Sequence, residues 1–454
     1  MALLFILLMV ALAASCDSSG SVIRENPFED VKEKAAIEVS TSSSADTVFI
    51  SWAPKGNGEF DGYKVTCTMA DYSKTFAKSA TGCFITRFPY LESVKVIIDQ
   101  TLKGETVSQT IIYPEIDGLD SHFLKKLMPD DGSSVSAGDG MYSVALPDGR
   151  SIFLIGDSFV TPVVNGARSK SAHMYRNTYI VYDPKTSKAT PIYEVNGPNT
   201  SAAVPPGHPY EDRWYWPGDG FVMDGNLYVF QSVMYMAGEG MWGFAFDRVH
   251  LLQYSLPDIK LVRDEPINFY STEEIHYGAA AMTEGDYVYI YAQLDLENGL
   301  DPKTAVYCAR ATKDNLWGAW EYYNGSDWVT GSSAAAELKG LSSIPVSSQF
   351  NVFKLRDKYV LLSENKKLWV HEIYTFVSDT PYGPWSHKRT IYTVPNFADE
   401  NLMCYNAMAH PQFEKDDMIL ISYDMNTSSG DQQAEDVSTY RPRFFWMPIE
   451  NILD

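Results

Sequence analysis

The chain has 454 residues, and 36 Lys and Arg against 58 Asp and Glu give it a formal net charge of −22. Hydrophobic residues make up 45% and charged residues 21% of the sequence, which excludes a disordered chain, and the length predicts two or three domains. The acidic balance, without a basic cluster, argues against a nucleic-acid partner, whereas 13% aromatic residues favour strands and sugar-binding surfaces.

An apolar run over residues 2–14 is the first feature of the chain. Its 13 residues are too few to span a bilayer and match the core of a signal peptide. The run ends in Ala13-Ala14-Ser15-Cys16, which resembles the lipobox of bacterial lipoproteins. We therefore expect a signal peptide at 1–15 and a tether at 16–34 that carries a lipid on Cys16. An ordinary secretory signal with an incidental cysteine is the alternative, and both interpretations predict export.

Residues 35–115 form the first predicted domain. Short apolar stretches separated by turn residues predict strands at 47–52, 62–67, 93–98 and 107–113. About 80 residues of short strands are typical of a β-sandwich. Trp52, followed after a turn by Gly62 and Tyr63, resembles the fibronectin type III pattern, in which an early buried Trp packs against a Tyr of the opposite sheet.

The cysteines beyond Cys16 have no spacing that indicates a zinc site. Cys67 and Cys83 lie in the predicted sandwich and could pair in an oxidising compartment, but the sequence leaves their pairing open. We expect no cofactor. A structural or channel-bound Ca²⁺ held by acidic residues is left as an alternative, although no compact ligand motif supports it.

An internal repeat fills residues 130–454. Five segments share an inner strand, a tight turn and a second apolar strand that ends in a polar residue, and they begin at residues 139, 219, 277, 349 and 405. This spacing fits four-stranded blades joined by variable loops. The sequence therefore predicts an all-β chain in which a small β-sandwich precedes a five-bladed β-propeller.

The repeat also predicts where the polar residues lie. In a propeller blade, the start of the inner strand and the end of the second strand meet at one mouth of the central channel. The pairs that should meet in the five blades are Asp139 with Asp157, Asp219 with Gln231, His276 with Gln293, Gln349 with Glu364, and Asn406 with Asp424. We expect Asp139, Asp157, Asp219, Glu364 and Asn406 to open onto one cavity.

Acids gathered in this way can perform acid–base chemistry. Neighbouring carboxylates push their pKa values apart, and glycoside hydrolysis uses such a pair as proton donor and as nucleophile or base. The candidate catalytic residues are Asp139, Asp157, Asp219 and Glu364. The candidate substrate-binding residues are Trp216, Gln231, His276, Gln293, Gln349, Tyr405, Asn406 and His410. The alternative for each acid is a turn or strand-end residue that binds backbone amides, and for each histidine a structural hydrogen bond.

The second part of the chain contains further specific motifs: Gly138-Asp139, Leu146-Pro-Asp-Gly-Arg150, Gly156-Asp157-Ser-Phe159, Trp216-Pro-Gly-Asp219 and Tyr405-Asn-Ala-Met-Ala-His410. Together, over about 133–452, they resemble the bacterial uncharacterised-domain families 5005 and 4185, both of propeller type. Relatives of the second family include endo-acting D-arabinanases, and five-bladed propellers host furanosidases and fructosidases. The resemblance implies that Asp139 and Asp157 are the catalytic acids, with Asp219 as a third candidate.

Two functions of different classes follow from these observations. The first is an exported, lipid-anchored glycoside hydrolase of the bacterial cell envelope that cleaves a furanoside-containing polysaccharide. The second is a non-catalytic cell-surface lipoprotein that binds glycans. Paired acids at one mouth favour the enzyme, because binding alone needs aromatic and amide groups more than carboxylates. In both cases we expect a monomer whose partners are a poly- or oligosaccharide and, through its anchor, a membrane.

Overall fold

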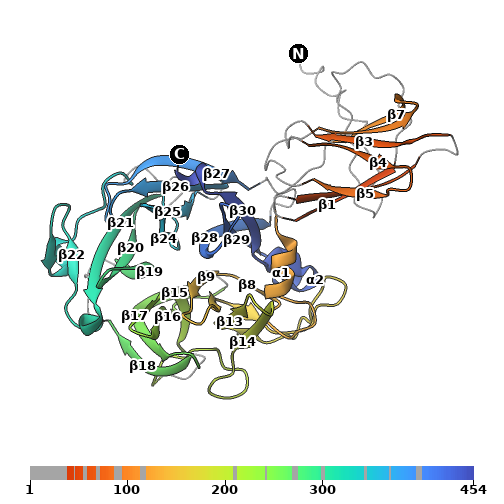
Figure 1. Cartoon of the computed structure of the whole chain (residues 1–454). Helices are drawn as coiled ribbons and strands as arrows, with labels where there is room; N and C mark the ends of the chain where they lie inside the picture. The colour runs from red at the N-terminus through yellow and green to blue at the C-terminus, as the bar shows by residue number, and fades with distance from the viewer. Residues whose placement is uncertain are drawn as a thin grey trace, which may run out of the picture. The chain divides into compact units, whose positions relative to one another are not determined.

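The computed structural model describes residues 38–44, 47–54, 59–67, 72–85, 95–112, 119–207, 212–240, 243–267, 275–297, 302–341, 345–367, 370–394 and 401–453. The predicted signal peptide, Cys16 and the tether lie outside these residues. Contacts divide the chain into two units, residues 1–119 and 120–454 (Figure 1).

The first unit contains two antiparallel sheets. One has the strand order β1-β2-β5, formed by Glu38–Ser44, Thr47–Ala53 and Gly82–Ile85; the other has the order β4-β3-β6-β7, formed by Tyr72–Ala77, Gly62–Cys67, Val96–Leu102 and Glu105–Ile112. Side chains of both sheets share one core, where the rings of Trp52 and Tyr63 lie 5.3 Å apart. Cys67 and Cys83 are both buried in this core.

The second unit begins with helix α1, Ser121–Leu127, in a stretch to which the sequence analysis assigned no element. Asp120 caps this helix, because its Oδ1 accepts a hydrogen bond from Phe123 N at 2.8 Å. Its other oxygen, Oδ2, accepts from Trp446 Nε1 at 2.9 Å. The start of the unit is thereby bound to its last strand, β30 (Arg443–Pro448).

Strands of the second unit form successive antiparallel sheets (Figure 1). The first contains β9 Tyr142–Ala145, β10 Ser151–Ile155, β13 Thr178–Asp183 and β14 Lys188–Ile192, and the short strands β8 Ala137–Gly138, β11 Ser158–Phe159 and β12 Met174–Tyr175 form a sheet that continues it. The second contains β15 Trp214–Met223, β16 Asn226–Met236, β17 Phe244–Ser255 and β18 Lys260–Pro266. The third contains β19 His276–Glu284, β20 Tyr287–Glu297, β21 Lys303–Thr312, β22 Glu321–Tyr323 and β23 Trp328–Thr330.

The remaining two sheets complete the unit. One contains β24 Asn351–Leu355, β25 Lys358–Glu364, β26 Glu372–Ser378 and β27 Ser386–Thr393; the other contains β28 Leu402–Lys415, β29 Met418–Thr427 and β30. The connection from β29 to β30 holds helix α2, Gly430–Glu435, and the 3-10 helix η3, Val437–Tyr440. Short 3-10 turns, η1 Lys313–Asn315 and η2 Ser332–Ala334, lie in the third sheet's connections, and helix α3, Glu450–Leu453, follows β30.

The first strands of these sheets surround a common centre. Contacts join β9 to β15, β15 to β19, β19 to β24, β24 to β28, and β28 back to β9. Apolar side chains of neighbouring sheets form shared cores between them. This arrangement confirms the all-β propeller that the repeat predicts. The number of blades stays a prediction, since β8, β11 and β12 form a sheet of their own.

Several inner strands lose their regular pairing at similar places in their sheets. The register shifts between Pro217 and Gly220 on β15, between Tyr277 and Ala280 on β19, and between Tyr405 and Met408 on β28. Such bulges redirect side chains and occur often beside functional sites. Asn406 lies in the β28 bulge with φ 56°, a left-handed conformation that asparagine tolerates better than most residues.

Candidate active site

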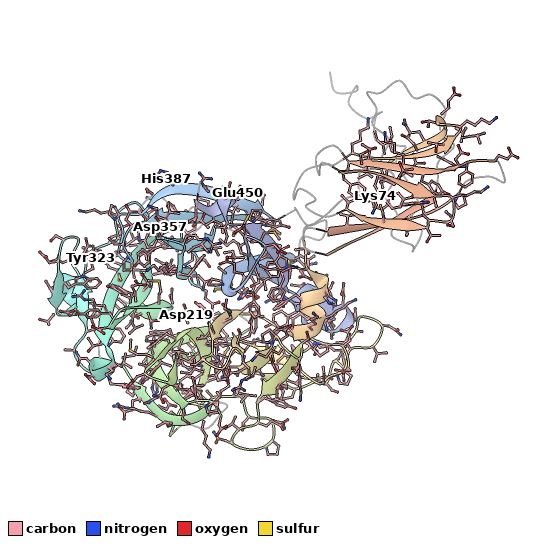
Figure 2. The ribbon with its side chains drawn as sticks, in the orientation of Figure 1. Lys74, Asp219, Tyr323, Asp357, His387 and Glu450 are labelled. Atoms are coloured by element: carbon pink, nitrogen blue, oxygen red, sulfur yellow. The ribbon has the colours of Figure 1, made fainter. Side chains whose placement is uncertain are left out.

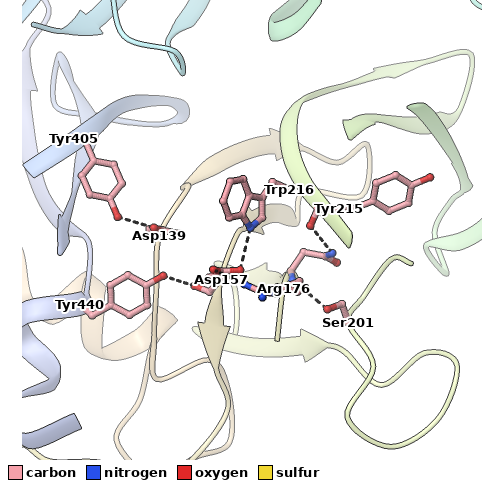
Figure 3. Close-up of polar contacts among 9 residues, drawn as sticks. Asp139, Asp157, Arg176, Ser201, Tyr215, Trp216, Tyr405 and Tyr440 are labelled. Carbon is pink, nitrogen blue, oxygen red and sulfur yellow. Dashed lines mark hydrogen bonds and ion pairs between the residues drawn. The ribbon is translucent and has the colours of Figure 1, made fainter. Parts of the chain in front are cut away.

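Asp139 and Asp157 are neighbours at one end of the first sheet, as the repeat predicts (Figure 3). Asp139 lies between β8 and β9, and Asp157 lies between β10 and β11. Gly156 N donates to the backbone oxygen of Asp139 at 2.7 Å and fixes the two segments side by side. A Cβ atom at residue 156 would lie 3.0 Å from Asp139 Oδ1, so the glycine makes room for this carboxyl group.

The carboxyl group of Asp139 holds its proton more tightly than an ordinary aspartate. Burial, followed by the nearby charge of Asp157, raises its pKa to about 7. Hydrogen bonds oppose this rise in part, and one of them is donated by Tyr405 Oη to Asp139 Oδ2 at 2.6 Å. Asp139 can therefore exist as a neutral acid near neutral pH.

Asp157 has a different environment. Burial raises its pKa, but the guanidinium of Arg176 and the indole of Trp216 oppose that rise. Arg176 Nη1 lies 3.2 Å from Asp157 Oδ2, and Trp216 Nε1 donates to Asp157 Oδ1 at 2.9 Å. Arg176 in turn stacks on Trp214, 4.4 Å from its ring centre. These contacts favour a carboxylate anion next to the more readily protonated Asp139.

Two further acids continue this group toward the fourth and fifth sheets. Asp424, on β29, is fully buried and accepts a hydrogen bond from Gly140 N at 2.6 Å. Burial, then the charge of Asp139 and to a smaller degree that of Glu364, raise the pKa of Asp424. The hydrogen bonds from Gly140 N and from the Asn406 side chain lower it in part. Glu364, at the end of β25, accepts a hydrogen bond from Cys404 Sγ at 3.1 Å, and burial raises its pKa to about 7.

Asp219 is held differently from the other acids. Its Oδ1 accepts from Gly220 N and its Oδ2 from Ala281 N, both at 2.8 Å. Burial raises its pKa to about 7. Because both oxygens bind backbone amides, Asp219 joins β15 to β19 near the centre of the propeller, where Figure 2 shows it. This geometry favours the structural alternative for Asp219.

The three predicted binding glutamines have unequal positions. Gln349 reaches the acid group, because its amide lies about 4 Å from where a Cβ on Gly140 would be. Gln231 is buried and donates to Tyr179 Oη at 2.7 Å. Gln293 donates to Asp295 Oδ1 at 2.5 Å. Gln349 thus lies beside Gly140, whose backbone N–H binds Asp424.

The two predicted histidines have structural surroundings. His410 is completely buried between Ser143 Oγ at 2.7 Å and Ser422 Oγ at 2.9 Å, and burial lowers its pKa to about 3. It is therefore a neutral residue that links β28 to β9. His276 stacks on Phe246, with 3.6 Å between ring centres.

Comparison with models of protein families identifies the family of this chain. Residues 129–448, about seven tenths of the chain, match the model of the domain of unknown function DUF5005. The chain belongs to the DUF5005 family. This confirms one of the two family resemblances noted in the sequence, over nearly the same residues. No curated protein matches the chain.

Solved structures resemble the DUF5005 domain in fold. One is a protein from Bacteroides ovatus that is named as a hydrolase on a provisional basis. It has 21% identity and a TM-score of 0.57, and the match covers 72% of this chain and 87% of that one. A GH62 α-L-arabinofuranosidase from Coprinopsis cinerea has 10% identity, a TM-score of 0.39 and coverages of 69% and 90%. A GH43_1 enzyme from Xanthomonas citri, in complex with xylotriose, has 12% identity, a TM-score of 0.39 and coverages of 72% and 92%.

Several residues around the DUF5005 acids were missed by the sequence analysis. Tyr440, on η3, donates from Oη to the backbone oxygen of Asp157 at 2.8 Å (Figure 3). Arg176 and Asn426 belong to the same surroundings. Asp424 was paired with Asn406 by the repeat but was not counted as a candidate acid. For Asp424 a signal existed, namely its place at the end of a second strand; Tyr440 and Arg176 lie in connections outside the repeat.

Within the described ranges, no group of three or more His, Cys, Asp or Glu side chains could hold a metal ion. In the same part of the chain, we find no helix with the length and apolar character needed to cross a membrane.

Proposed function

We propose that this chain is an exported glycoside hydrolase that acts on a furanoside-containing polysaccharide. The observation that carries the proposal is the pair Asp139 and Asp157, two neighbouring carboxyl groups in unlike environments. Asp139 has a pKa of about 7 and can donate a proton, while Arg176 and Trp216 favour the anionic form of Asp157. The furanoside substrate class rests on the motifs that resemble arabinanase-related propellers.

The two groups divide the chemistry of glycosidic bond cleavage between them. Asp139 transfers its proton to the leaving glycosidic oxygen while the bond from that oxygen to the anomeric carbon breaks. Asp157 either adds to the anomeric carbon or removes a proton from the water that adds there. The negative charge of Asp157 also stabilises the positive charge that develops on the sugar ring. When Asp157 adds to the anomeric carbon, water then displaces it from the sugar and gives a proton back to Asp139. When Asp157 acts as the base, water supplies the hydroxyl of one product and its proton remains on Asp157.

The proposal is tested with the full-length protein and a panel of arabinans, fructans and xylans. Asp139→Asn and Asp157→Asn keep the size of the side chain but remove the group that chemistry requires, so turnover should fall by at least ~10²-fold while glycan binding persists. Asp148→Asn, in the exposed turn between β9 and β10, is the matched control and should keep full activity. If the wild-type protein binds a glycan of the panel but releases no sugar from it, the glycan-binding alternative replaces the enzyme.

We also infer that the mature chain is anchored to the bacterial cell envelope by a lipid on Cys16. The two-sheet first unit would then be a fibronectin type III-like spacer, a reading supported by its strand orders and by the packing of Trp52 on Tyr63. Cys16→Ser should move the protein from the membrane fraction to the soluble fraction. Retention of the variant in the membrane fraction would contradict the anchor.

A further inference from the structure

The carboxyl group of Asp139 lies at the end of a chain of hydrogen bonds that starts in the connection from β29 to β30. Gln433 Nε2, on α2, donates to Asn426 Oδ1 at 2.8 Å. Asn426 Nδ2, on β29, donates to Tyr405 Oη at 2.6 Å. Tyr405 Oη, on β28, donates to Asp139 Oδ2, also at 2.6 Å. Three polar side chains thus connect the last sheet to the proposed acid.

The direction of every bond in this chain is determined by one backbone amide. Thr427 N donates to Asn426 Oδ1 at 2.7 Å, and a backbone N–H can only donate. The Nδ2 group of Asn426 therefore faces Tyr405 and must donate to it. Because the oxygen of Tyr405 accepts this bond, its single hydrogen is free to point at Asp139. Burial raises the pKa of Tyr405 well above its ordinary value, so this hydrogen is kept.

We propose that Asn426 is a positioning residue that, through Tyr405, decides which oxygen of Asp139 carries the transferable proton. This inference rests on the proposed glycosidase function. With Tyr405 donating to Oδ2, that oxygen is an acceptor, and the proton of neutral Asp139 is placed on Oδ1. Oδ1 faces Gly156, whose backbone leads directly into Asp157. The proton is thus held beside the backbone of Gly156.

Other charged and titratable groups also surround Asp139. The carboxyl groups of Asp157 and Asp424 act on it from the first and fifth sheets, and the hydroxyls of Tyr405 and Tyr440 face it. Arg176 lies behind Asp157, and Glu364 lies behind Asp424. A substitution at Asn426 leaves the chemical identity of all these groups unchanged.

Asn426→Asp tests the inference with almost no change of shape. One oxygen of the new carboxylate keeps the bonds from Thr427 N and Gln433. The other replaces Nδ2 and accepts a hydrogen bond, so the Tyr405 hydrogen should turn away from Asp139. Asp139 then loses a donor and should stay protonated to higher pH. Tyr405→Phe, which deletes the hydroxyl, should have an effect in the same direction and serves as the second variant.

The readout is the protonation of Asp139 itself, measured on the full-length protein without substrate. A water-soluble carbodiimide modifies protonated carboxyl groups, and tandem mass spectrometry distinguishes Asp139 from Asp157. We expect Asn426→Asp to raise the midpoint of Asp139 labelling by at least about one pH unit. Gln432→Glu is the matched control, because it adds the same charge to α2 at a residue whose Oε1 accepts from Thr427 Oγ1. It should leave the midpoint in place.

The double variant separates the hydrogen-bond chain from simple charge repulsion. If the chain carries the effect, adding Asn426→Asp to Tyr405→Phe should shift the midpoint by much less than it does when Tyr405 is present. An unchanged midpoint in Asn426→Asp would overturn the inference, and so would an equal shift in both backgrounds. Failure to hydrolyse any glycan would refute the proposed function without altering this titration.

Discussion

Glu364 should make the second unit less stable as the pH rises from acid to neutral. Its side chain is 3% exposed, its Oε2 has no hydrogen-bond partner among the described residues, and Cys404 donates only a weak thiol bond to its Oε1. Burial raises its pKa from 4.5 to about 7. The folded chain therefore keeps this proton up to about pH 7, whereas the unfolded chain releases it near pH 4.5.

The size of the effect follows from this difference. At about 1.4 kcal/mol for each pKa unit, ionising Glu364 in the folded state costs on the order of 3 kcal/mol. This stability is complete below pH 4.5 and is lost as the pH rises toward 7. Glu364→Gln keeps the shape of the side chain and does not titrate. At pH 8 the variant should therefore be more stable than the wild type by up to about 3 kcal/mol, and near pH 4.5 this advantage should disappear.

Urea unfolding followed by tryptophan fluorescence measures this prediction. Nine of the ten tryptophans lie in the second unit, so the signal reports mainly on the propeller. Glu239→Gln, at an exposed position between β16 and β17, is the control, and its effect should not depend on pH. A difference between Glu364→Gln and wild type that is the same at pH 4.5 and pH 8 would show that Glu364 is not held neutral by burial.

Two further predictions concern Gly156 and Asp219. Gly156→Ala places a Cβ 3.0 Å from Asp139 Oδ1, so it should lower kcat on the cleaved glycan by about 10- to 100-fold. Gly430→Ala is the control, because a Cβ there meets open space, and its kcat should equal that of the wild type. Equal kcat values for the two variants would refute the steric role of Gly156. Asp219→Asn turns one of the two carboxylate acceptors into an NH₂ group that faces a backbone N–H. The free energy of unfolding should therefore fall by about 1 to 3 kcal/mol, as measured by urea titration at pH 8. Unchanged stability would show that its bonds to Gly220 and Ala281 do not hold β15 and β19 together.

Much of the fold was predictable because the repeat is a local pattern. Alternating apolar residues and turn residues recur in every sheet, and the antiparallel hairpin then determines which strand ends meet. The neighbours Asp139 and Asp157 follow from this rule alone, and so does the closeness of Asn406 to Asp424. The packing of Trp52 on Tyr63 in the first unit was expected instead from a resemblance to the fibronectin type III pattern.

The roles of individual side chains were less predictable because they depend on contacts across the ring. Asp219 has the same sequence surroundings as a site acid, but a backbone amide of the next sheet, Ala281 N, occupies one of its oxygens. Tyr440 comes from an insertion between β29 and β30 that has no counterpart in the repeat. No periodic signal in the sequence could indicate that this connection returns to the first sheet.

The ring closes between segments that lie at opposite ends of the second unit. Tyr405 reaches Asp139 across 266 residues, and Asp424 reaches Gly140 across 284. Trp446 binds Asp120 across 326 residues. During synthesis, Asp139 and Gly140 therefore emerge long before Tyr405 and Asp424, which bind them. Contacts between such distant segments form late and slowly in folding. A chain that stops before β28 would carry Asp139 and Asp157 without Tyr405 and Asp424, so the hydrogen bonds that surround the acid pair are complete only when the last sheet has docked.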